Sequence, residues 1–265
     1  MQHNSEKQRI VLAVEYDGQG LCGWQRQKDA PSVQALVEGA LARIDGEHVA
    51  CVAAGRTDAG VHAEAMAVHV DVDAGRFLRS SNAYLHGLNS LLPEQIRIVG
   101  VRAVPADFHA RFDCRERAYR YQIWNRTTAS ALAPWRHWWM PRPLNPELMQ
   151  EAAACLLGRH DFSAFRASGC QANSPVREIR QLDIERHGYS VELFFRADAF
   201  LYHMVRNIVG SLVEVGLGNW PPEKMAELLE KKDRTMAAAT ATAHGLYFTN
   251  AVYDDFSSAD LIESR

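Results

Sequence analysis

Two stretches, residues 179–186 (IRQLDIER) and 189–197 (YSVELFFRA), decide the fold class of this chain. Both alternate apolar and polar residues, the pattern of a half-buried strand. Only His187 and Gly188 separate them, and so short a connection joins antiparallel neighbours in a β-hairpin. At least part of the sheet is therefore antiparallel, which favours an α+β fold over a doubly wound parallel fold.

Outward from this hairpin, strands interleave with helices in both halves of the chain. Ser32 is a predicted N-cap, because the apolar residues that follow it recur on one helical stripe. Further strands are predicted at 9–16, 48–54, 65–72, 95–104, 117–125 and 246–253, and helices near 33–44, 81–92, 146–157, 200–216 and 221–231. We place a first half at 1–104, a second at 105–253 after Pro105, and a polar tail at 254–265.

Composition sets limits on what the protein does. Hydrophobic residues make up 47% of the 265 residues and charged residues 23%, a balance typical of soluble globular proteins. We expect no secretory signal in MQHNSEKQRI and no membrane span in 199–218, which polar residues interrupt. The five cysteines contain no C-x-x-C pair, which favours a reducing cytoplasm and neither a disulfide framework nor a metal site. Glycine-rich nucleotide motifs are absent too, so we expect no cofactor.

Charge is distributed unevenly along the chain. The formal net charge is −3, yet residues 102–142 hold eight arginines against three acids. Arginine outnumbers lysine, and its planar guanidinium suits paired hydrogen bonds to phosphate and stacking on bases. GC-rich codon usage is an alternative explanation for the overall arginine excess but not for this cluster, so the distribution, rather than the sum, favours a nucleic-acid-binding surface in this segment.

The stretch AGRTDAGVH (54–62) sets one carboxylate, Asp58, between two glycines and two residues after Arg56. Glycines let the backbone adopt unusual dihedral angles and let a substrate approach closely. With predicted strands on both sides, Asp58 would stand at the end of a sheet, where it is a nucleophile, a base or simply a turn-forming residue.

The predicted helix 200–216 places Arg206 away from a continuous apolar stripe. One interpretation is a solvated polar face. The other is that Arg206 faces a cleft and pairs with a carboxylate, for which Asp58 is the candidate.

Arginines and aromatic residues mix in the segment 111–121. On a strand, Arg117, Tyr119 and Tyr121 share one face, which suits phosphates and unstacked bases, although such tyrosines also form cores. The tryptophan cluster at 135–139 (WRHWW) favours packing or a subunit interface over base stacking, and His62 and His109 are interpreted as structural.

These stretches occur together in one order, and in that order the chain resembles the TruA family of tRNA pseudouridine synthases from about residue 9 to 253. The matching segments are EYDG…GWQRQ (15–27), SVQ (32–34), AGRTDAGVH (54–62), DFHARF (107–112), YRY (119–121), DFSAFRA (161–167), HMVRNIVGSLVEVG (203–216) and DRTMAAATATAHGLYF (233–248). Leu21 and Cys22 depart from the pattern, because the family often has aromatic residues there.

The resemblance implies a role for each matching residue. Asp58 matches the catalytic nucleophile, Arg206 its basic partner, and Arg56 the arginine that helps to hold the flipped-out nucleotide. Tyr119 matches the tyrosine that contacts the target base, and Leu246 an apolar wall of the base pocket.

The resemblance also implies the architecture and the substrate. The family fold has two α/β halves around a continuous, mainly antiparallel sheet with helices on one side and a central basic cleft. It works as a cytoplasmic homodimer on uridines at positions thirty-eight to forty, in the anticodon arm of tRNA, without a cofactor or metal. Attack on the sugar C1′, addition to C6 and removal of a sugar proton all stay open for Asp58. A non-catalytic RNA-binding module and a metal-free hydrolase are the rival interpretations.

Overall fold

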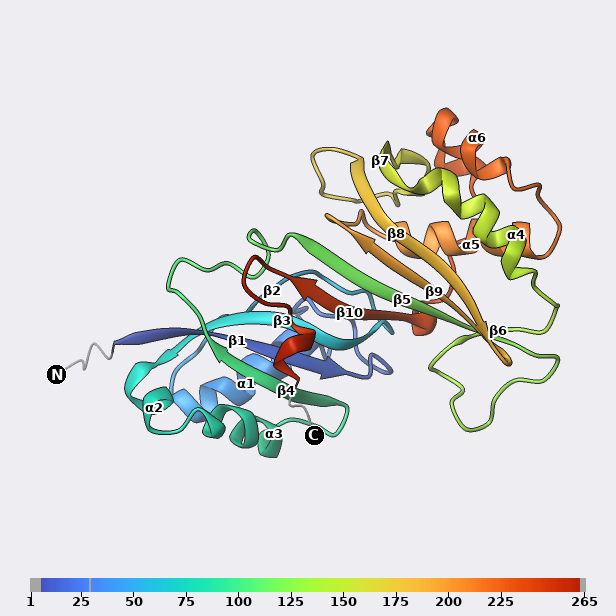
Figure 1. Cartoon of the computed structure of the whole chain (residues 1–265). Helices are drawn as coiled ribbons and strands as arrows, with labels where there is room; N and C mark the ends of the chain where they lie inside the picture. The colour runs from blue at the N-terminus through green and yellow to red at the C-terminus, as the bar shows by residue number, and fades with distance from the viewer. Residues whose placement is uncertain (1–5, 29, 263–265) are drawn as a thin grey trace. The chain divides into compact units, whose positions relative to one another are not determined.

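The computed structural model describes residues 6–28 and 30–262 (Figure 1). Over these residues, ten strands belong to one mixed, mostly antiparallel sheet, and the helices pack against it. The predicted α+β fold class is therefore confirmed. The chain forms two compact units: unit 1 is Met1–Arg115 with Phe248–Arg265, and unit 2 is Glu116–Tyr247.

Unit 1 is built around strand β1 (Lys7–Tyr16), which pairs antiparallel with β3 (His62–Asp73) and with β4 (Ile96–Ala103). Residues 10–14 of β1 are fully buried without alternation, because both faces of the strand are covered. Two further strands neighbour β3: β10 (Leu246–Val252) and the short β2 (Val52–Ala53). The predicted strand at 48–54 is thus mostly loop, and this loop leads into the AGRTDAGVH stretch.

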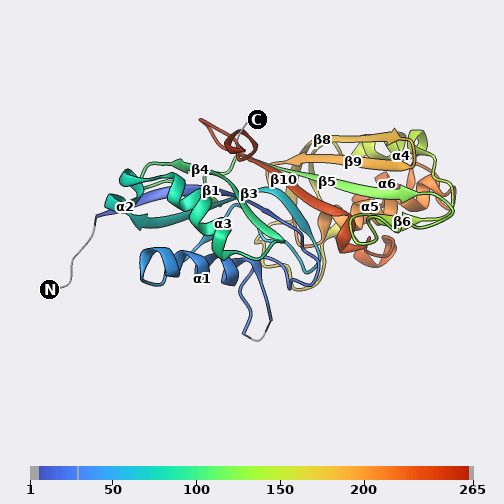
Figure 2. The same cartoon turned by 90° about the horizontal axis from the view of Figure 1, so that it is seen from below.

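The helices of unit 1 agree only in part with those that the sequence predicts. Helix α1 (Val33–Asp45) begins after Ser32, whose side-chain oxygen accepts a hydrogen bond from the backbone N–H of Ala35, so the predicted N-cap is confirmed. A short helix α2 (Ala74–Arg79) was not predicted. The predicted helix at 81–92 divides into a π-helical turn (Ala83–Gly87) and α3 (Leu88–Leu91). Helices α1 and α3 contact each other, and Figure 2 shows them against the strands of the unit.

Unit 2 contains the hairpin that decided the fold class. Strand β5 (Glu116–Asn125) pairs antiparallel with β9 (Ser190–Ala197), and β9 pairs with β8 (Val176–His187). The turn consists of Gly188 and Tyr189, one residue later than predicted, since His187 pairs with Ser190 and Gly188 takes the positive φ. Two short strands that the sequence did not predict complete the unit: β6 (Trp138–Met140), parallel to β5, and β7 (Gly158–Asp161), antiparallel to β8.

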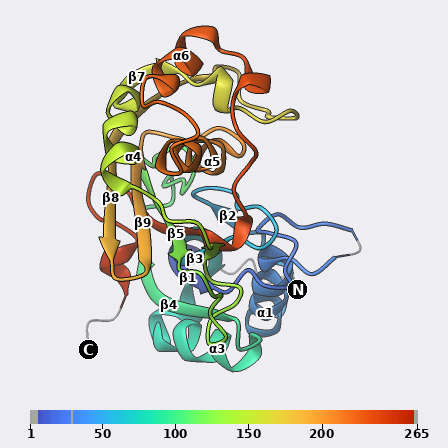
Figure 3. The ribbon, with the colours of Figure 1, turned by 90° about the vertical axis from the view of Figure 1, so that its right-hand side faces the viewer.

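Three helices of unit 2 pack together (Figure 3). They are α4 (Pro146–Ala153), α5 (Met204–Gly216) and α6 (Lys224–Lys231). Helix α4 contacts the other two and also packs against β8. Helix α5 begins four residues later than predicted, because His203 adopts a left-handed conformation with φ 59° that no helix interior tolerates. Short 3₁₀ turns cover Ala154–Leu156, Ser163–Phe165, Arg234–Met236 and Ala243–Gly245 here, and Ala259–Leu261 in unit 1. None of the described helices is long and apolar enough to cross a membrane.

Candidate active site

The loop that carries Asp58 is held in unit 1 by hydrogen bonds to neighbouring segments. The carbonyl of Thr57 accepts a hydrogen bond from the backbone N–H of Trp24 at 3.0 Å. The buried Thr57 hydroxyl shares a 2.8 Å hydrogen bond with Tyr16 Oη, and the N–H of Val61 closes the turn onto the Asp58 carbonyl at 3.2 Å. The carboxylate of Asp58 therefore stands, half-buried, on a loop whose backbone is fixed on both sides, while Arg56 is exposed.

Two glycines of the EYDG…GW stretch allow that loop to approach so closely. A Cβ atom at Gly23 would lie 2.4 Å from the Thr57 carbonyl oxygen, and one at Gly18 would lie 2.2 Å from the carbonyl oxygen of Val61. Both distances are far below any van der Waals contact, and Gly23 also has φ +80°. Residues 15–27, a weak signal in the sequence alone, thus cradle the AGRTDAGVH loop.

His62 joins the same loop to the end of β1. Its ring is 3% exposed, and Nδ1 lies 3.1 Å from the backbone nitrogen of Gly18 and 3.0 Å from a carboxylate oxygen of Asp17. These contacts hold the C-terminal end of the loop, after Asp58, whereas Trp24 holds the loop just before Asp58.

Tyr119, which is predicted to contact the base, and Tyr121 lie on strand β5 of unit 2. Tyr119 and Tyr121 lie opposite Phe195 and Leu193 of β9, so both rings project from one face of the sheet. The Tyr121 hydroxyl donates a hydrogen bond to the Thr242 carbonyl at 2.8 Å. Burial raises the pKa of Tyr121, so its hydroxyl stays protonated and serves as a structural donor.

Tyr119 has different surroundings from Tyr121. It is 8% exposed, and its ring meets Phe200 edge to face, with 5.0 Å between the centroids. This contact fixes the plane of the Tyr119 ring before any substrate binds.

Arg206 lies in the first turn of α5 and is half-buried. Its Nε donates to the Ala241 carbonyl at 2.8 Å, and the Ala241 N–H donates to the Arg206 carbonyl at 3.1 Å. The reciprocal pair ties the arginine to the segment that leads into Leu246, which is 6% exposed at the start of β10. Of the predicted residues, Tyr119, Arg206 and Leu246 thus belong to or border unit 2, whereas Asp58 and Arg56 belong to unit 1.

Sequence reasoning missed Asn207, the neighbour of Arg206. Its side chain is fully buried, donates to the Phe165 carbonyl at 2.8 Å, and accepts hydrogen bonds from Arg234 at 3.0 Å and Thr240 at 2.6 Å. Asn207 therefore organises the segment 233–242, the beginning of the DRTMAAATATAHG stretch. An asparagine off the apolar stripe of a helix resembles a solvated residue, so the sequence held no signal for this role.

Some arginines of the arginine-rich segment 102–142 pair with carboxylates from elsewhere in the chain. Arg115 is bidentate to Asp254 at 3.0 Å, and Arg120 pairs with Glu192 at 3.3 Å. The guanidinium of Arg120 also stacks over the Tyr247 ring, 4.9 Å from its centroid. Acids from outside the segment therefore neutralise part of its positive charge.

The tryptophan cluster of the sequence mainly packs. Trp138 meets Tyr121 edge to face at 6.3 Å, and Trp139 Nε1 donates to the Arg126 carbonyl at 2.9 Å. Trp135 keeps half of its surface exposed and meets His244 edge to face at 5.8 Å. The structure describes no cluster of His, Cys, Asp and Glu with the geometry of a metal site.

The sequence model of the family described as tRNA pseudouridine synthase matches residues 12–113 and 152–254. The chain belongs to the tRNA pseudouridine synthase family. It is 48% identical to "tRNA pseudouridine synthase A" of Nitrosomonas europaea over 93% of this chain and 89% of that protein. It is 46% identical to the protein of the same name from Methylobacillus flagellatus, over 93% of this chain and 93% of that protein. It is 47% identical to the Escherichia coli protein of that name, over 93% of this chain and 90% of that protein.

Membership of this family makes the protein an isomerase that converts uridine to pseudouridine in tRNA. The matched ranges include the Asp58 loop, Arg206 and Leu246, whereas Tyr119 lies between them. The residues of this tRNA pseudouridine synthase that were identified by motif thus lie on the loop around Asp58, on β5, at the start of α5 and at the start of β10.

Proposed function

We propose that this pseudouridine synthase acts on uridines at positions thirty-eight to forty of the anticodon stem-loop, with Asp58 as its nucleophile. The observation that supports this assignment best is the fixed loop around Asp58. A turn-forming aspartate needs only its local hydrogen bonds. Here Trp24, Tyr16 and two close-fitting glycines hold the loop instead, so that a carboxylate is presented in one defined position.

The reaction breaks the bond between C1′ and uracil N1, turns the base, and forms a bond between C1′ and C5. The hydrogen at C5 leaves as a proton and N1 gains one, so atoms balance and no electrons are gained or lost. Asp58 meets either the electron-poor sugar or the base, and a covalent intermediate would divide one difficult step into two easier ones. The three routes open to Asp58 differ in the atom that its carboxylate reaches.

The other residues bind the target nucleotide in this proposal. The target uridine must leave its stack, which costs a few kcal/mol that protein contacts offset. Tyr119, fixed edge to face by Phe200, would contact the extruded base, and Leu246 would form an apolar wall. Arg206 would supply the basic partner of the carboxylate, and the exposed Arg56 would hold the displaced nucleotide.

The working form is, by the same proposal, a cytoplasmic homodimer. Five free cysteines, two of them buried, suit a reducing compartment. Exposed apolar side chains in residues 132–139, with Leu132 98% exposed, are the kind of surface that a second copy covers.

Asp58→Asn tests the nucleophile directly. The variant keeps the size of the side chain and much of its hydrogen bonding but removes the charge and the nucleophilic oxygen. We expect an unchanged Tm, retained tRNA binding, and tritium release from tRNA labelled at uridine C5 reduced to background. Asp255→Asn, an exposed acid in the same unit and outside the family motifs, is the matched control and should release tritium at the wild-type rate. Appreciable isomerisation by Asp58→Asn would refute the assignment.

A further inference from the structure

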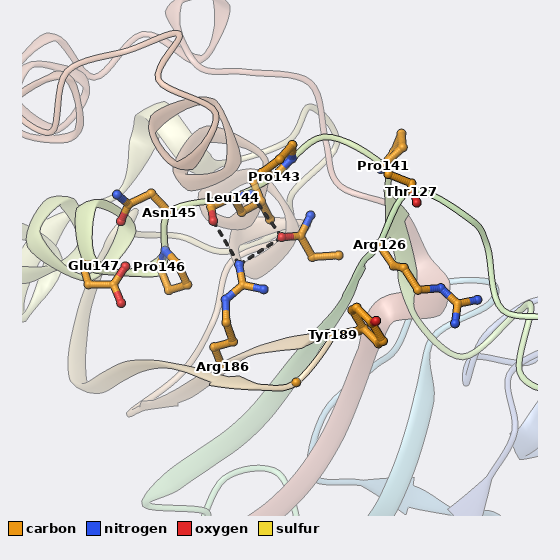
Figure 4. A pocket seen from close by; sticks show the side chains of 12 residues that line it. Arg126, Thr127, Pro141, Pro143, Leu144, Asn145, Pro146, Glu147, Arg186 and Tyr189 are labelled. Atoms are coloured by element: carbon orange, nitrogen blue, oxygen red, sulfur yellow. Dashed lines mark hydrogen bonds between the residues drawn. The ribbon is translucent and has the colours of Figure 1, made fainter.

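A cavity lies entirely within unit 2, at the end of β5 and beside the β8–β9 turn (Figure 4). Its volume is about 640 Å³, which is in the range of small-molecule and cofactor sites. Proline side chains form much of its wall, and Arg126 and Arg186 also line it. Figure 4 shows the Arg186 guanidinium turned toward Leu144, whereas the Arg126 guanidinium points away from it, at the edge of the cavity. Asn125 lies six residues beyond Tyr119 on β5, roughly 20 Å along the strand at about 3.4 Å per residue, so the cavity is separate from the base-contacting tyrosine.

Arg186 is fixed in this cavity by neutral groups. Its Nη2 donates to Asn125 Oδ1 at 3.0 Å and to the Leu144 carbonyl at 2.9 Å, as the dashed lines of Figure 4 show. Asn125 is itself held, since its Nδ2 donates to the carbonyls of Met140 at 3.0 Å and Arg142 at 2.7 Å. The position of the Arg186 guanidinium is therefore set before any ligand arrives.

Arg126 is fixed in a similar way. Its Nε donates to the Thr128 carbonyl at 3.0 Å and its Nη2 to the Ala129 carbonyl at 2.9 Å. The guanidinium carbon lies 5.3 Å from the ring centroid of Trp124 and 5.5 Å from that of Tyr189, within the distance of cation–π contact.

The positive charge of both side chains is left uncompensated. Carbonyl and amide oxygens hold the guanidinium groups, and neither Arg126 nor Arg186 forms an ion pair with a described carboxylate. Arg196 of the same unit differs, because its guanidinium lies 2.6 Å from the Glu116 carboxylate. Glu147 also lines the cavity but pairs with neither arginine among the described residues, so the lining keeps a net positive charge.

We propose that Arg186 in this cavity and Arg126 at its edge each bind a backbone phosphate of the tRNA substrate, at nucleotides other than the target uridine. Guanidinium groups fixed by neutral acceptors lose little conformational entropy when they bind, and their remaining N–H groups donate charge-assisted hydrogen bonds to phosphate oxygens. The exposed ring of Tyr189 gives the adjoining sugar an apolar surface. The inference rests on tRNA being the substrate and adds contacts that position the tRNA.

The salt dependence of tRNA binding tests the proposal. Arg126→Gln, Arg186→Gln and the double variant would be titrated with intact tRNA at several salt concentrations. We expect each single variant to bind about 10-fold more weakly at low salt and its slope of log Kd against log salt to fall by about one. The double variant should lower the slope by about two, as the loss of two phosphate contacts requires. The value of kcat at saturating tRNA should be unchanged, because the contacts position the tRNA and take no part in the chemistry. Arg196→Gln, an arginine already paired with Glu116, should leave the slope unchanged.

Each outcome has a single interpretation. Unchanged affinity and slope in the double variant would overturn the proposal, as would a loss of kcat with an unchanged slope, since that result indicates a structural role alone. Arg126→Gln leaves the Asn125 contacts untouched, so this variant stays informative even if replacing Arg186 impairs folding. Tritium release by the wild-type enzyme tests the proposed function separately, because it does not depend on either arginine.

Discussion

Gly23→Ala should disable the enzyme by moving the loop that carries Asp58, even though Gly23 contributes no side chain. Gly23 has φ +80°, and an added Cβ would lie 2.4 Å from the Thr57 carbonyl oxygen and 2.9 Å from the Asp58 carbonyl carbon. To restore even a tight 3.0 Å contact, the Thr57 carbonyl must retreat by about 0.6 Å, and an ordinary contact of 3.4 Å requires about 1 Å. A misplacement of about 1 Å at a reacting group costs on the order of 100-fold in rate.

Gly20→Ala is the matched control for this variant. Gly20 has nearly the same backbone conformation, with φ +74°, but no atom lies within 4 Å of an added Cβ. Both alanines pay the left-handed strain of about 1–2 kcal/mol, and only Gly23→Ala adds the clash. We therefore expect Gly20→Ala to lower the free energy of unfolding by roughly that amount and to keep its activity.

The assay is tritium release from tRNA labelled at uridine C5, measured as kcat and KM, with urea unfolding of each variant alongside. Gly23→Ala should lose about 100-fold in kcat, beyond any loss that its stability explains, while Gly20→Ala stays within a few-fold of wild type. Equal activity in the two variants would refute the argument, because it would mean that the position of the Thr57–Asp58 backbone does not limit catalysis.

Burial, and then the charge of Arg9, lower the pKa of His69 to about 4 from an ordinary 6.5. The unfolded chain therefore takes up a proton that the folded protein does not, and the stability present above pH 6.5 should fall by about 2 kcal/mol at pH 5 and further as the pH falls through 4. Urea unfolding at pH 5 and at a pH above 6.5 measures this loss of stability, which His69→Gln should abolish. Tyr119→Phe should reduce tritium release but keep most tRNA affinity, because its ring persists. Tyr121→Phe should lower the free energy of unfolding by about 1 kcal/mol, because the hydrogen bond to Thr242 is lost, and should leave catalysis unchanged. Loss of activity in Tyr121→Phe but not in Tyr119→Phe would contradict the roles assigned to the two tyrosines.

The sequence predicted those elements whose signals are local. Ser32 caps α1 because its hydroxyl reaches a nearby N–H, and the hairpin of β8 and β9 follows from alternation on both sides of a two-residue turn. Both features depend on residues within a few positions of one another. The family motifs were equally legible, since each is a short run with a fixed order.

Features that depend on tertiary contacts were not predictable from the pattern. The apolar stripe of α5 extends back to Leu201, which is buried, yet the helix begins only at Met204 because His203 takes a left-handed conformation. The short strands β6 and β7 carry no alternation long enough to detect. The cradle around Asp58 depends on two glycines distant in sequence from the loop, and only their close approach to Thr57 and Val61 gives them a role.

The arginines show most clearly that the number of charged residues in a segment does not by itself predict how well the segment binds an anion. The segment 102–142 has a surplus of positive charge in the sequence, but a charge contributes to binding an anion only if no carboxylate already holds it. Arg115 and Arg120 are held by Asp254 and Glu192, whereas Arg126 is held by carbonyl oxygens. We therefore expect the segment to bind less phosphate than its surplus suggests, and to do so through arginines such as Arg126 that neutral groups hold. Arg186, which lines the same cavity as Arg126, lies outside this segment. Counting charges along the sequence would therefore not have grouped the two arginines.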